Sequence, residues 1–224
     1  MFAVLFEVNP HGEQWDTYLD LAKTLKPELE SIDGFVDNIR YASLTRGGWI
    51  LSLSSWRDEK ALVRWRTRAR HHGVQIQGRE QVLADYHLRV GQITQDTHVP
   101  EGYLLQEQRL DETQVGEATT VTLITNRCSP AWVRDTDPTD VAQQLGLDTA
   151  ADGLKSWDVF DAVLTAGDTI LVLSWQNHDA ANHFATNTRC PNGTRLRTVR
   201  VVRDYGMFDR RESPQYYPDP QTKT

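Results

Sequence analysis

The feature that most constrains the fold of this chain is an internal repeat. Four landmarks in the first half of the sequence recur in the same order, 119 or 120 residues further along. The pairs are Asp33-Gly34-Phe35 with Asp152-Gly153-Leu154, Leu44-Thr45-Arg46-Gly47 with Leu164-Thr165-Ala166-Gly167, Ile50-Leu51-Ser52-Leu53-Ser54 with Ile170-Leu171-Val172-Leu173-Ser174, and Asp85-Tyr86 with Asp204-Tyr205. Such self-similarity at a fixed spacing indicates two copies of one structural module.

The landmarks divide the 224 residues into four parts. We predict a first module at 1–91, a linker at 92–117, a second module at 118–210 and a proline-rich tail at 211–224. The linker contains Pro100 and Gly102 and has room for a short strand over 103–108. Because Tyr216 and Tyr217 are costly to leave in water, we expect the tail to lie across the body of the protein.

The order of elements is clearest in the first copy. Apolar residues recur every three or four positions over 13–30 and 58–82, which predicts two helices, with Gly73 and Gly78 as candidate interruptions of the second. Alternating segments at 2–9, 35–43, 49–56 and 84–91 predict four strands, and Gly47-Gly48 predicts a hairpin turn between the middle two. The second copy has the same order, with a first helix interrupted by Pro130 and Pro138.

This order, β-α-β-β-α-β, is that of the ferredoxin-like module. A four-stranded sheet with both helices on one face leaves its other face bare. We therefore predict an α+β protein in which two tandem modules pack sheet to sheet as a pseudo-dimeric α/β barrel. The fused pair itself could associate further as a homodimer.

Charge and composition exclude several functions. A net charge of −7 argues against general nucleic-acid binding and against a polybasic membrane anchor. Two cysteines give no disulfide framework, and no apolar run reaches the roughly 18–20 residues of a membrane helix, so we expect a cytoplasmic protein. The absence of a Gly-x-Gly-x-x-Gly loop argues against a Rossmann-type flavin or NAD site.

The sequence resembles the antibiotic biosynthesis monooxygenase family of the dimeric α/β-barrel superfamily. The resemblance rests on the module order, on Asp33-Gly34-Phe35, and on the strand 49–56 followed by Arg57-Asp58-Glu59-Lys60-Ala61. It covers both copies. It implies a ligand pocket between the sheet and the helices of one module, and a chemistry drawn from a group that includes cofactor-free oxygenases and haem enzymes.

The second helix of the first copy carries the main candidate for catalysis. Ala61, Trp65, Ala69, His72 and Ile76 follow one another at helical spacings, so they share one face of a continuous helix. This places His72 beside Trp65 at the expected pocket. His71 is rotated by about 100° and is the second choice.

Three functions of His72 are open at this point. The imidazole could bind a haem iron, as the resemblance to haem-degrading monooxygenases implies, it could act as a general acid or base, or it could be a structural histidine. Haem is therefore the one cofactor that we consider, and the alternative is no cofactor.

Five further residues are candidates for ligand binding. Trp49 and Trp65 could form an aromatic wall for a flat molecule, and Asn38 and Arg40 could supply polar contacts from the second strand. Arg79 is the member of an arginine-rich stretch that we expect to turn toward a substrate carboxylate, whereas the others suit a solvated helix face. Because the second copy lacks the paired histidines and the arginine cluster, we expect the site in the first copy.

The sequence thus predicts a monooxygenase-like oxidoreductase that acts on a flat, hydrophobic small molecule, with His72 as a haem ligand or proton carrier. Two alternatives stay open: a haem enzyme of another reaction type, and a non-catalytic ligand-binding or stress protein.

Overall fold

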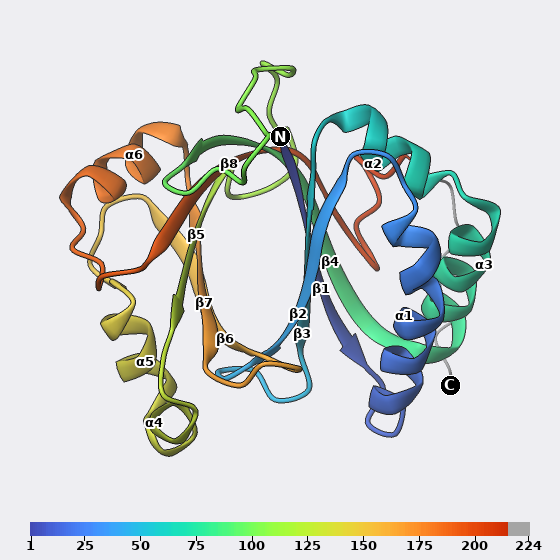
Figure 1. The fold of residues 1–224 in the computed structure, drawn as a ribbon, viewed down its shortest axis with the longest axis horizontal. Coiled ribbons are helices and arrows are strands. Elements are labelled where there is room, and N and C mark those ends of the chain that lie inside the picture. The colour runs from blue at the N-terminus through green and yellow to red at the C-terminus, as the bar shows by residue number, and fades with distance from the viewer. Residues whose placement is uncertain (215–224) are drawn as a thin grey trace.

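The computed structural model describes residues 1–214. These residues form a closed barrel of β-strands with helices on two opposite sides (Figure 1). Because the description ends at Pro214, the predicted course of Tyr216 and Tyr217 lies outside the described residues.

The first half of the barrel begins with strand β1 and helix α1 and continues through the hairpin β2–β3. The elements are β1 (Phe2–Pro10), α1 (Trp15–Glu30), β2 (Phe35–Ser43), β3 (Ile50–Trp56), α2 (Glu59–Arg66), α3 (Ala69–Gln77), the π-helical turn η1 (Gly78–Val82) and β4 (Leu83–Asp96).

The second half has the same strand arrangement with shorter helices. Its elements are β5 (Thr120–Arg127), α4 (Pro130–Asp135), α5 (Pro138–Gln144), β6 (Leu154–Ala162), β7 (Asp168–Trp175), α6 (His178–Asn187) and β8 (Arg195–Gly206). Pro130 and Pro138 each open a short helix, where a missing N–H costs nothing.

The strands follow one another around the barrel in the order β1-β3-β2-β6-β7-β5-β8-β4, and all neighbouring pairs are antiparallel. Each half therefore contributes a ferredoxin-like four-stranded sheet. The halves join at a short β2–β6 pairing and a long β4–β8 pairing. The α+β barrel fold predicted from the repeat is confirmed.

Side chains alternate between the barrel interior and the helix-covered exterior. Leu5, Leu51 and Leu53 belong to an apolar cluster inside the barrel, together with Val172 and Val199 of the other half. The intervening residues face the helices, which lie on opposite sides of the barrel: α1–α3 cover the first half and α4–α6 cover the second (Figure 1).

Strand pairing corrects one part of the repeat. Trp56 pairs with Phe2 and Trp175 pairs with Thr120, so Trp56 and Trp175 are equivalent. Leu51 therefore corresponds to Ile170, both in the interior cluster, and the 120-residue alignment of Ile50 with Ile170 is one residue off. In a strand, that single step exchanges the two faces of the sheet.

Two other predictions also differ from the structure. The second helix of the first half is broken at Thr67–Arg68, where Arg68 is extended (φ −65°, ψ 129°), and not at Gly73. The short strand expected over 103–108 is not formed, and β4 continues to Asp96.

Candidate active site

A cavity of about 220 Å³ lies between the outer face of the first-half sheet and the helices that cover it. Most of its wall is apolar. Helix α1 contributes Leu21, Ala22, Leu25 and Leu29, the second-helix region contributes Leu62, Val63, Trp65 and Val74, and the strands contribute Val4, Phe6, Leu88 and Val90. An apolar wall with a few polar groups is typical of small-molecule sites.

The floor of the cavity is polar. Asn38 and Arg40 on β2 and Ser52 and Ser54 on β3 project from alternate positions toward the helices. Asn38 Nδ2 donates to Ser52 Oγ at 3.0 Å and to the carbonyl oxygen of Leu53 at 3.2 Å. The amide is therefore held in place by the sheet.

Arg40 meets helix α1 across the cavity. Its side chain and that of Ser52 hydrogen-bond to the hydroxyl of Tyr18, and burial raises the pKa of Tyr18, so the phenol stays neutral. Arg40 Nε is buried and has no hydrogen-bond partner among the described residues. A half-buried guanidinium with a spare buried donor is suited to an oxygen atom of a ligand.

His71 lines the cavity wall opposite this floor. Its ring stacks on Trp65, with centroids 4.2 Å apart and planes at 17°, and its Nδ1 lies 3.1 Å from the carbonyl oxygen of Trp65. Because a carbonyl oxygen only accepts, Nδ1 carries the proton and Nε2 is left with a lone pair. Burial lowers the pKa of His71 to about 4, so the ring is neutral near pH 7.

The expected orientation of the two histidines was wrong. We predicted His72 at the pocket from a continuous helix, but the break at Thr67–Arg68 restarts the helical phase at Ala69. As a result His71 lines the cavity and His72 does not. Asp58 caps α2 by accepting from the backbone N–H of Ala61, and Thr67 ends the same helix by hydrogen-bonding to the carbonyl oxygen of Val63.

The five predicted ligand-binding residues divide into two groups. Asn38, Arg40, Trp65 and Arg79 line the cavity, whereas Trp49 does not. Trp49 precedes β3 and packs against the guanidinium of Arg46 at 4.6 Å, so the predicted aromatic wall is formed without it. Arg79 is buried, and its Nη1 donates to the carbonyl oxygen of Met207 at 2.8 Å and to Tyr86 Oη at 3.2 Å.

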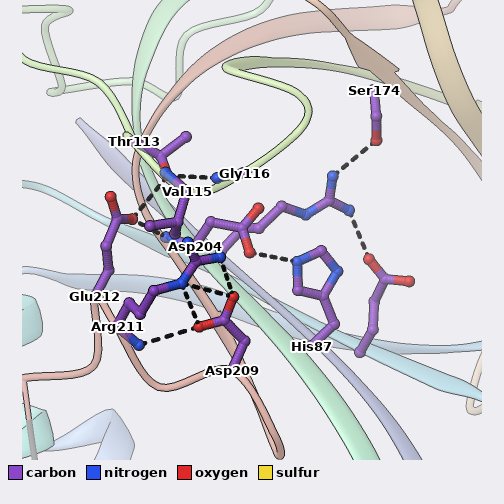
Figure 2. A network of polar contacts seen from close by, with 11 residues as sticks. His87, Thr113, Val115, Gly116, Ser174, Asp204, Asp209, Arg211 and Glu212 are labelled. Carbon is purple, nitrogen blue, oxygen red and sulfur yellow. Dashed lines mark hydrogen bonds and ion pairs between the residues drawn. The ribbon is translucent and has the colours of Figure 1, made fainter.

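The chain that follows β8 closes one side of the cavity. Arg210 and Pro214 line it, and Arg210 also hydrogen-bonds to Tyr86. Glu212 fixes this segment, because its carboxylate accepts from Thr113 Oγ1, from the backbone N–H of Gln114 and from that of Asp204, each at 2.7 Å. Figure 2 shows Glu212 beside Thr113 and Asp204. The first-half cavity is thus completed by residues from the end of the second half, a contribution that no sequence pattern indicated.

The equivalent space in the second half is filled. Opposite pairs Asn38–Ser54 and Arg40–Ser52 correspond to Trp157–Leu173 and Val159–Leu171. These apolar residues pack with Trp175 and Phe184, whose rings lie 4.9 Å apart, in one cluster under α5 and α6. The candidate site described above therefore lies in the first half, and its role in the reaction stays a prediction.

The lining and the volume of the cavity bear on the predicted haem. His72 is not in the cavity, and His71, whose Nε2 keeps a lone pair, is the histidine that lines it. A volume of about 220 Å³ is below the range of roughly 300–1,000 Å³ for drug-sized ligands, and a porphyrin is larger than most of these. The residues as arranged do not fit a haem.

Comparison with known proteins adds independent findings. The family model of antibiotic biosynthesis monooxygenases matches residues 1–75. A protein of Pyricularia oryzae named jasmonate monooxygenase ABM is 48% identical over 223 residues, covering 97% of this chain and 99% of that protein.

Solved structures with low similarity include two monooxygenase candidates. One from Fusobacterium nucleatum is 6% identical with a TM-score of 0.37, covering 91% of this chain and 93% of its own. One from Lactobacillus acidophilus is 8% identical with a TM-score of 0.39, covering 91% and 94%. In the described residues, no helix is long and apolar enough to cross a membrane. On the near-full-length identity to the Pyricularia protein, this chain belongs to the antibiotic biosynthesis monooxygenase family and is a monooxygenase-like enzyme.

Proposed function

We propose that this enzyme oxygenates a small, mainly apolar carboxylic acid of the jasmonate type in the first-half cavity. The relative that is 48% identical is named for jasmonate. Jasmonate combines an apolar body with one carboxylate. The observation that carries the proposal is the pairing of an apolar wall with a half-buried arginine whose buried Nε has no partner among the described residues.

In this proposal the carboxylate binds at the floor of the cavity. Arg40 is the anchor, because it is the arginine that projects from the sheet between Tyr18 and Ser52. The apolar body lies against Leu25, Leu29 and Trp65 on the helices. A charge-assisted hydrogen bond in a site shielded from water fixes the position and orientation of the acid.

His71 is the residue of the cavity that we assign to proton handling. Monooxygenation places one atom of dioxygen in the substrate and reduces the other to water, which requires two electrons and two protons. The two protons come from water. A neutral ring with a free lone pair on Nε2 takes up a proton from water and passes it on, or accepts a hydrogen bond from a protonated oxygen intermediate. The two electrons come from the substrate or from an added reductant, and the assay below separates these sources.

The test is turnover of jasmonic acid under isotope-labelled dioxygen, with and without a reduced nicotinamide. We expect a product that contains one labelled oxygen atom. Arg40→Met is expected to raise KM by at least about tenfold because a buried charged pair is lost. Arg64→Met is the matched control, since Arg64 is exposed and pairs with Asp33.

The two neighbouring histidines provide a second matched pair. His71→Gln is expected to lower kcat by roughly 10²-fold or more, the usual contribution of one proton-transfer group, whereas His72→Gln leaves it within about twofold. Binding of jasmonic acid without any labelled product would contradict the proposed reaction.

Two further predictions are tested separately. Titration with haem is expected to give no Soret band that depends on His71 or His72, because the cavity does not fit a porphyrin. Light scattering tests the predicted homodimer of the fused pair. The module boundaries at 91 and 118, and the cytoplasmic location, remain predictions.

A further inference from the structure

A second cavity, of about 260 Å³, opens into the barrel interior on the opposite face of the sheet from the first. On β2, Asp37, Ile39 and Tyr41 face this cavity, whereas Asn38 and Arg40 face the first one. Ile39 at its rim is 43% exposed, so the cavity is open to solvent. The two cavities are therefore separate compartments.

Arg197 on β8 forms part of the cavity wall and is 3% exposed. Within residues 1–214, no carboxylate forms an ion pair with it, and its Nε is buried without a hydrogen-bond partner. Burial, followed by the charge of Arg195, lowers its pKa from the usual arginine value. A cation held out of water without a partner is costly, so this position is a candidate site for an anion.

The two other arginines of this cavity are already paired. Arg195 donates to Asp96 from Nε at 2.9 Å and from Nη2 at 2.6 Å. Arg127 Nε lies 3.7 Å from Asp168 Oδ1. Asp37 faces the cavity without an ion pair to Arg197, and its charge disfavours a multiply charged anion there. Among the described residues of this wall, Arg197 is thus the arginine that has no ion pair, and the charge of Asp37 offsets it at longer range.

Another buried arginine of the barrel interior, Arg89, has a carboxylate and a hydroxyl as partners of its Nη atoms, although its Nε also lacks a hydrogen-bond partner. Glu7 binds Arg89 at 2.6 Å and Arg46 at 2.5 Å, and Arg89 also donates to Ser174. Burial raises the pKa of Glu7, but the two arginines outweigh it and the net pKa is lowered. Among the described residues, Arg197 therefore differs from Arg89 in having no carboxylate as an ion-pair partner.

We propose that the barrel cavity binds a small monocarboxylate, with Arg197 as its anchor and the Tyr41 hydroxyl as a second donor. The planar guanidinium matches a carboxylate with two parallel hydrogen bonds. Tyr41 is 3% exposed and faces the same cavity. Burial raises the pKa of Tyr41 to about 12, so the hydroxyl stays protonated and able to donate. Leu53 and Ile39 provide an apolar wall for a short carbon chain.

The experiment is a thermal-unfolding series with sodium formate, acetate, butyrate, phosphate and chloride at constant ionic strength. With a dissociation constant of about 1 mM, about 20 mM carboxylate raises Tm by roughly 3–6 °C. Chloride at the same ionic strength is expected to leave Tm within about 1 °C.

Variants assign the effect to the cavity. Arg197→Met is expected to remove the carboxylate-dependent shift while raising Tm in chloride, because an unpaired buried charge is gone. Arg200→Met is the matched control: Arg200 is on the same strand, does not line this cavity and pairs with Glu107, so the shift persists. Tyr41→Phe is expected to weaken binding by about fivefold, which also tests the site if Arg197→Met does not fold.

The proposal is overturned by any of three results: no carboxylate-specific shift, a shift that persists in Arg197→Met, or a shift seen with phosphate and not with carboxylates. None of these readouts uses turnover, so this proposal and the proposed oxygenase reaction fail independently.

Discussion

The two halves of the barrel have the same strand order and the same pairing, but one half encloses a cavity and the other is filled. Asn38, Arg40, Ser52 and Ser54 form the polar floor of the first half, and Trp157, Val159, Leu171 and Leu173 occupy the same places in the second. Four positions on two strands therefore separate a candidate active site from an ordinary core.

The difference arises because the two sets of side chains fill the space between sheet and helices to different extents. Large apolar residues reach the helices and exclude water, which contributes most of the stability of a module. The small or polar residues of the first floor leave space and keep hydrogen-bonding groups at its edge. We infer that the second half stabilises the barrel on which the first half carries its site.

The largest expected effect on stability comes from creating a cavity in the core of the second half. Leu173 is fully buried, so Leu173→Ala is expected to lower the free energy of unfolding by about 2–5 kcal/mol. Ser54→Ala, at the equivalent place, removes only a hydroxyl that accepts from Trp56 Nε1 and costs about 1 kcal/mol. Urea unfolding measures both, and equal losses would contradict the comparison.

A pH effect of intermediate size is expected from the hollow half. The pKa of His71 is about 4 in the folded protein, below its unfolded value of about 6.5, so the unfolded chain binds more protons between these values. The stability associated with neutral His71 is present above about pH 6.5 and is lost as the pH falls toward 4, by up to about 3 kcal/mol.

Urea unfolding of the wild type and of His71→Gln at pH 7 and pH 4.5 tests this effect. The variant is expected to lose part of the pH dependence, whereas His72→Gln keeps it. A His71→Gln variant with unchanged pH dependence would show that the buried ring is not the titrating group.

The smallest expected effect on stability comes from filling the hollow half. Ser52→Leu copies the residue found at the equivalent place, Leu171, into the floor of the cavity. Burying a leucine contributes about 1.5–3 kcal/mol, and losing the hydrogen bonds of Ser52 with Asn38 and Tyr18 removes about 2 kcal/mol, so the free energy of unfolding is expected to change by less than about 1 kcal/mol. Binding of jasmonic acid to the cavity is expected to fall at least tenfold, measured by calorimetry in an Arg197→Met background. Unchanged affinity would place the ligand elsewhere.

Much of the fold was predictable from the sequence because periodicity and repetition are local signals. The strand alternation and the helical spacing gave the module order, and the repeat indicated the barrel. Asn38, Arg40, Trp65 and Arg79 were correctly expected to lie at one pocket.

The remaining features depend on geometry that spacing alone does not contain. The helix break at Thr67–Arg68 involves neither glycine nor proline. Because it changes the helical phase, His71 and not His72 lines the cavity. The sequence alignment of β3 with β7 was one residue off. It therefore did not show that Ser52 and Ser54 in the first half correspond to Leu171 and Leu173 in the second. The place of Arg197 follows from closure of the barrel, which brings β8 opposite β2.

The central claim is that the first-half cavity holds the substrate and the equivalent space of the second half does not. Its most direct test is a crystal structure of the complex with jasmonic acid. We predict one molecule between the first-half sheet and α1–α3, with its carboxylate at Arg40. A molecule between the second-half sheet and α4–α6, or an empty first-half cavity at saturating jasmonic acid, would contradict the account.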